Sequence, residues 1–74
     1  MKIASFVIEA IDSSGEELKK FLSNIEGISI YSEKDNSYVV VFECESLNNV
    51  ESFFKEISKN ELVKAVLPVY ISEL

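Results

Sequence analysis

Two segments of this chain repeat apolar side chains at the spacing i, i+3, i+4, i+7, which places those side chains on one face of an α-helix. The repeated positions are Leu18, Phe21, Leu22 and Ile25 in the first segment and Val50, Phe53, Phe54 and Ile57 in the second. Stretches rich in β-branched and aromatic residues, which favour strands, flank both segments. A chain of this kind folds by packing the apolar stripes of its helices against a sheet.

The changes in periodicity predict where each element begins and ends. Strands are predicted over residues 3–11, 28–33, 38–44 and 62–71. Ser14, followed three residues later by Glu17, predicts a capping box at the start of the first helix, and Ser46 predicts the cap of the second.

Three further signals predict how the elements are connected. Gly27 and Asn60 are expected to end the two helices in the left-handed conformation. Residues 34–37 contain Asp35 and Asn36, which tolerate positive φ, and therefore predict a tight turn between two strands.

The order of the predicted elements is βαββαβ. Short hairpins and right-handed crossovers then favour one ferredoxin-like α+β domain over residues 1–74, an antiparallel sheet ordered 4-1-3-2 with both helices on one face. The strongly apolar first and third strands would be central, and Pro68 would lie in an edge strand, where proline is tolerated.

The alternation of side chains along the strands predicts which residues face the helices and which lie on the opposite, open face. The helix side is assigned Ala4, Phe6, Ile8, Ala10, Tyr38, Val40 and Phe42. The open side is assigned Ser5, Val7, Glu9, Ser29, Tyr31, Glu33, Val39, Val41, Glu43, Val66, Pro68 and Tyr70. This assignment predicts an apolar strip rimmed by carboxylates, which suits an apolar peptide that carries basic residues. A solvated sheet face, or dimerisation through the sheet, is the alternative interpretation.

Composition narrows the function further. Thirteen Asp and Glu against seven Lys give a net charge of −6, which disfavours nucleic acid and anionic membrane surfaces as partners. The chain has no His, and its lone Cys44 is expected to be a buried structural residue. We therefore expect a cytoplasmic binding module, a monomer or weak dimer without membrane insertion, rather than an enzyme, with no catalytic residues, no metal site and no cofactor.

Four stretches carry a resemblance to a known family: residues 4–8 (Ala-Ser-Phe-Val-Ile), the helix end at residues 22–28, residues 37–45 with their Glu-x-Glu close, and residues 63–70 (Val-Lys-Ala-Val-Leu-Pro-Val-Tyr). Together they resemble the NapD chaperones over about residues 3–72. Ile71 and Ser72 depart from the family, which often has His after the tyrosine.

The resemblance implies a chaperone that binds the twin-arginine signal peptide of the catalytic subunit of a periplasmic nitrate reductase. Binding would delay export by the Tat translocase until the molybdenum cofactor is inserted. Glu9 and Glu43, with Glu33 or Glu45, are the expected partners of the two arginines. The expected contacts of the rest of the peptide are Ser5, Val7, Tyr31, Val39, Val41 and Tyr70. The alternative is an amino-acid-sensing domain of the Lrp/AsnC or ACT type, acting as a dimer.

Overall fold

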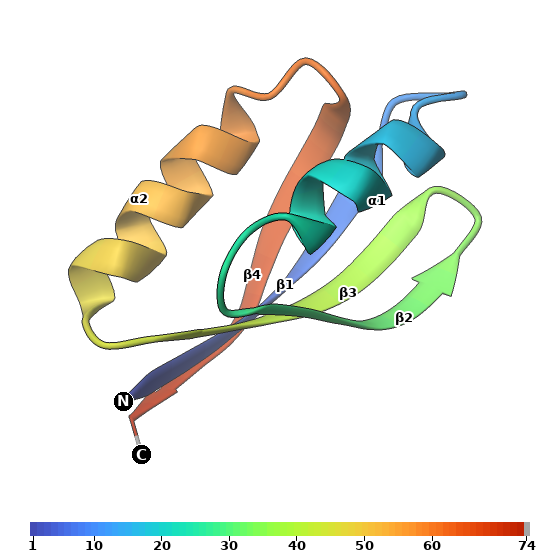
Figure 1. Ribbon diagram of the computed structural model, residues 1–74. Helices are drawn as coiled ribbons and strands as arrows, with labels where there is room; N and C mark the ends of the chain where they lie inside the picture. Colours follow the sequence, from blue (N-terminus) through green and yellow to red (C-terminus); the bar gives the residue numbers. More distant parts are fainter. Residues whose placement is uncertain (74) are drawn as a thin grey trace.

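The computed structural model describes residues 1–73 and contains the predicted order of elements. The strands and helices are β1 (Lys2–Ala10), α1 (Gly15–Ser23), β2 (Ile28–Lys34), β3 (Ser37–Cys44), α2 (Leu47–Ser58) and β4 (Val63–Glu73). The three strand pairs are antiparallel, and the sheet has the order β2-β3-β1-β4, which confirms the predicted ferredoxin-like topology. Both helices lie on the same side of the sheet (Figure 1).

The core lies between this sheet and the two helices. All seven residues that alternation assigned to the helix side are buried, and Leu18, Leu22, Val50, Phe53 and Ile57 of the helices pack against them. Phe53 stacks on Phe42 at a ring separation of 4.9 Å and lies 5.3 Å from Phe6. The β-branched and aromatic residues of β1 and β3 therefore support the two central strands.

The two helices begin differently. The predicted capping box of α1 is wrong, because the Ser14 side chain makes no capping hydrogen bond there. At α2, the Ser46 amide donates to the Asn49 side-chain oxygen at 3.2 Å, and the reciprocal bond to the Ser46 side chain is also present. The prediction that Ser46 caps α2 is thus confirmed. Asn49 occupies the position in the capping box where glutamate or glutamine is usual.

The connections confirm the positive φ predicted for two residues and correct the predicted end of each helix. Gly27 has a φ of 89° and Asp35 a φ of 56°, so both adopt the predicted positive φ. Gly27 does not end the helix, however, because α1 stops at Ser23 and Asn24 is its C-cap in the right-handed region. Asn60, in contrast, does not adopt positive φ, since only Ser13 and Asp35 do so among the described non-glycine residues. The Asn60 side chain instead accepts a hydrogen bond of 2.8 Å from the Leu62 amide and so organises the turn into β4.

Irregularities in the two edge strands change which side chains face the helices. In β2, Ile30 pairs with Val40 and Ser32 pairs with the adjacent Val39, so Tyr31 is an extra residue without a partner on β3. In β4, Tyr70 pairs with Ser5 and Pro68 with Phe6, which makes Val69 the extra residue. Each bulge reverses the alternation of the strand beyond it.

Candidate functional site

The sheet face opposite the helices, called the open face below, is built from four rows of side chains that run across the strands. The two central rows are Tyr70–Ser5–Val41–Ser29 and Leu67–Val7–Val39–Ser32, in the order β4, β1, β3, β2. Paired residues of antiparallel strands share a face, so each row is a set of neighbours about 5 Å apart. The central rows therefore place apolar side chains of three strands side by side.

The predicted residues of β1 and β3 lie on this face as expected. Ser5, Val7 and Glu9 alternate with the buried residues of β1, and Val39, Val41 and Glu43 do the same on β3. Val7 is paired directly with Val39, and Ser5 with Val41. Tyr70 also lies on this face and is 58% exposed.

Three expectations for the edge strands are wrong, and the bulges explain why. Val66 pairs with the buried Ile8 and Pro68 with the buried Phe6, so both belong to the helix side of β4. Sequence reasoning instead missed Leu67, which pairs with Val7 on the open face and is 55% exposed. The run from Val63 to Ile71 is apolar at nearly every position, and for that reason it carries no alternation that could have indicated Leu67.

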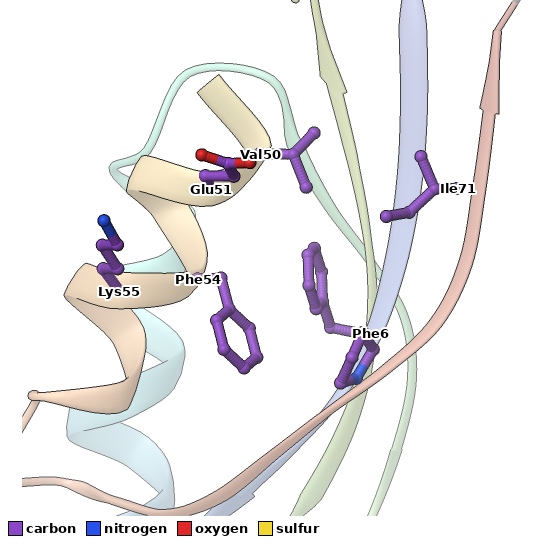
Figure 2. A pocket seen from close by; sticks show the side chains of 7 residues that line it. Phe6, Val50, Glu51, Phe54, Lys55 and Ile71 are labelled. Atoms are coloured by element: carbon purple, nitrogen blue, oxygen red, sulfur yellow. The ribbon is translucent and has the colours of Figure 1, made fainter. Parts of the chain in front are cut away.

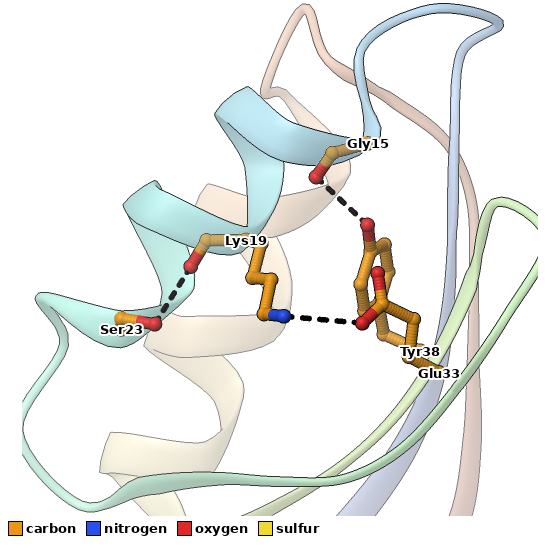
Figure 3. Close-up of polar contacts among 5 residues, drawn as sticks. All are labelled: Gly15, Lys19, Ser23, Glu33 and Tyr38. Carbon is orange, nitrogen blue, oxygen red and sulfur yellow. Dashed lines mark hydrogen bonds and ion pairs between the residues drawn. The ribbon is translucent and has the colours of Figure 1, made fainter.

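Glu33 is the third correction. It pairs with the buried Tyr38 and therefore lies on the helix side of the sheet. Its Oε1 accepts a hydrogen bond of 3.1 Å from Nζ of Lys19 on α1 (Figure 3). This bond to Glu33 raises the pKa of Lys19. Glu33 is thus bound to a helix and does not belong to the expected carboxylate rim of the open face. Tyr31 lies in the bulge without a partner on β3 and is 72% exposed, so it belongs to none of the rows of the open face.

The two remaining carboxylates mark opposite ends of the open face. Glu43 pairs with Ile3, and Ile3 precedes Glu9 by six positions on β1, which corresponds to about 20 Å along the strand. Glu9 shares its row with Ala65, Ser37 and Lys34. Glu43 shares its row with Ile3 and Ser72, and the exposed Glu45 follows it in sequence. The row of Glu43 therefore contains no lysine, whereas the row of Glu9 ends in Lys34.

Cys44 takes no part in the open face. It pairs with Lys2 on the helix-side phase and packs against the core as a partly buried residue. Its Sγ lies 3.3 Å from the carbonyl oxygen of Ser46, at the start of α2. Cys44 therefore packs against the core on the predicted side of the sheet, but it is partly buried rather than buried as predicted.

No helix in the described part of the chain is both long and apolar enough to cross a bilayer.

Comparison with known proteins identifies the family. The chain is similar over 97% of its length to the solution structure of the E. coli Tat proofreading chaperone protein NapD, with a TM-score of 0.82, 20% identity and coverage of 78% of that chain. No match was found among curated protein sequences. The family model described as NapD protein matches residues 1–73. This chain therefore belongs to the NapD protein family.

Proposed function

We propose that this protein is a cytoplasmic chaperone that binds the twin-arginine signal peptide of the catalytic subunit of a periplasmic nitrate reductase on its open face. Bound in this way, the peptide is withheld from the Tat translocase until the molybdenum cofactor has been inserted. Membership of the NapD family supports this role, and the similar solved structure is that of a Tat proofreading chaperone.

The observation that carries the proposal is the chemistry of the open face. A signal peptide consists of a short basic region followed by an apolar segment of about 7–15 residues. The central rows offer apolar contacts from Val7, Val39, Val41, Leu67 and Tyr70. Carboxylates lie beyond these rows at both ends, and the net charge of −6 favours encounter with a cationic peptide.

The position of the carboxylates favours one end of the open face for the arginine pair. Consecutive Cα atoms are only 3.8 Å apart, whereas Glu9 and Glu43 are separated by about 20 Å along the strand direction. The two carboxylates therefore act as two separate sites for a peptide with adjacent arginines. Glu43 is the partner of the arginine pair in this proposal, because Glu45 follows it and the row of Glu9 ends in Lys34.

Calorimetric titration with a synthetic twin-arginine peptide tests the proposal. We expect binding to the native chain, weaker binding when Lys-Lys replaces Arg-Arg because lysine lacks the bidentate fork, and a several-fold loss with Glu43→Gln. Glu9→Gln is the matched control on the same face and should bind within about twofold of the native chain. Equal losses with both variants would contradict the Glu43 assignment, and failure of the native chain to bind any twin-arginine peptide would remove the function.

A further inference from the structure

The second half of β4 exposes apolar side chains on both faces of the sheet. Leu67 and Tyr70 lie on the open face, while Ile71 pairs with the buried Ala4, lies on the helix side and is nevertheless 51% exposed. The helix layer covers the centre of the sheet, where Phe6 is 1% exposed, but it leaves this end of β4 uncovered.

An apolar groove of about 250 Å³ lies between α2 and this part of β4 (Figure 2). Its apolar lining consists of Phe6, Val50, Phe54, Pro68 and Ile71. The rings of Phe6 and Phe54 stack with centroids 6.2 Å apart. Two charged residues, Glu51 and Lys55, also border the groove, and both belong to α2. The residues that β1 and β4 contribute to the lining are all apolar.

The groove and the open face lie on opposite sides of the same edge strand, β4. Pro68 follows Leu67 in sequence and Ile71 follows Tyr70, so each exposed open-face residue of β4 is adjacent to a residue that lines the groove. β4 is an edge strand, so no further strand separates the two surfaces. A chain that crosses the central rows towards β4 and turns around this edge reaches the groove.

The size of the central rows indicates that an apolar segment would reach this edge. From β3 to β4 the rows extend over two strand spacings, or about 10 Å. A hydrophobic segment of about 7–15 residues is about 23–50 Å long when extended. With its arginines near Glu43 on β3, such a segment reaches beyond Tyr70 when it is extended.

We propose that the groove between α2 and β4 takes a large apolar side chain from the hydrophobic region of the signal peptide. This inference rests on the proposed function and extends the peptide site from the open face to the helix side. Glu43 then holds the basic end, the central rows hold the first apolar residues, and the groove holds a Leu or Phe that follows them.

Peptide titration with a pair of matched variants tests this proposal. Ile71→Ser removes one wall of the groove without altering the open face, and Leu47→Ser changes a residue of α2 that is similarly exposed, at 49%, and does not line the groove. Half-burial of one isoleucine predicts that Ile71→Ser weakens binding of the twin-arginine peptide about five- to tenfold. Leu47→Ser should stay within about twofold.

Chemical-shift mapping with the same peptide provides the second measurement. We expect the side-chain signals of Val50 and Phe54 to move on addition of the peptide, together with those of Val7 and Val39. If the peptide binds and moves only the open-face signals, and Ile71→Ser binds like the native chain, the groove proposal is wrong and the proposed function stands. If the peptide does not bind the native chain at all, both are wrong. Shifts of Val50 and Phe54 that depend on protein concentration without peptide would assign the groove to a second copy of the chain and overturn the proposal.

Discussion

The hydroxyl of Tyr38 donates a hydrogen bond of 2.8 Å to the carbonyl oxygen of Gly15, which ties the central strand β3 to the first residue of α1 (Figure 3). Tyr38 is 1% exposed, so this polar contact lies at the boundary of the core. A β-carbon added at Gly15 would lie 2.8 Å from the same hydroxyl, so glycine allows the close approach. This contact connects the helix layer to the sheet independently of apolar packing.

Substitution of Tyr38 by Phe should lower the free energy of unfolding by about 1 kcal/mol, the usual net value of one hydrogen bond. The ring remains in the core, so the change isolates the hydroxyl. Urea unfolding of the native chain and of Tyr38→Phe measures the difference. Unchanged stability would show that the Gly15 carbonyl is equally well satisfied by water.

Alkaline pH should destabilise the native chain more steeply than Tyr38→Phe. Burial, with the negative charge of Glu33 adding to it, raises the pKa of Tyr38 above its ordinary value of 10.0. The folded state then keeps the phenol proton to higher pH than the unfolded chain, so the contribution to stability is complete below pH 10.0 and decreases as the pH rises further.

Unfolding midpoints measured between about pH 8 and pH 11.5 test this sign. The pKa of Lys19 is raised mainly by its bond to Glu33, which Tyr38→Phe leaves in place, so the Lys19 contribution acts in the same direction in both proteins. The two slopes should differ by up to one proton. Parallel curves would mean that Tyr38 titrates alike in the folded and unfolded states.

Gly27 should be one of the least replaceable residues outside the core. Its φ of 89° is in the left-handed region, and a β-carbon there would collide with the carbonyl oxygen of Glu43. The Gly27 carbonyl also accepts a hydrogen bond of 2.9 Å from the Glu43 amide. We expect Gly27→Ala to cost about 1–3 kcal/mol of stability in urea unfolding. The exposed neighbour Glu26→Ala is the control, and an equal, small effect of both changes would contradict the steric argument.

The sequence alone predicted the face of each side chain correctly only where a strand pairs in a regular register. β1 and β3 pair in a continuous register, so a period of two placed Phe6 and Val7 on opposite faces correctly. In β2 the residues from Ile28 to Tyr31 suggest the same period of two, but the bulge at Tyr31 moves Glu33 to the helix side.

The edge strands could not be assigned from pattern because a bulge depends on how a strand fits its neighbour rather than on its own composition. Tyr31 and Val69 do not differ in type from residues found in regular strands. The groove is a similar case, because it arises from the spacing between α2 and β4, and neither element encodes that spacing by itself. Sequence thus predicted the open face, while its boundary at β4 required the register.

The adjacent residues Val39 and Val40 provide a final test of this division between faces. Val40 is fully buried, and Val40→Ala should lower the free energy of unfolding by about 2 kcal/mol through lost burial and a cavity. Val39 lies in a central row and is 37% exposed, so Val39→Ala should change stability by only about 0.5 kcal/mol. In the titration with the twin-arginine peptide the order reverses: Val39→Ala weakens binding several-fold, and Val40→Ala, measured where it remains folded, binds as the native chain does. Loss of peptide affinity in Val40→Ala but not in Val39→Ala would place the peptide on the helix side and contradict the open-face site.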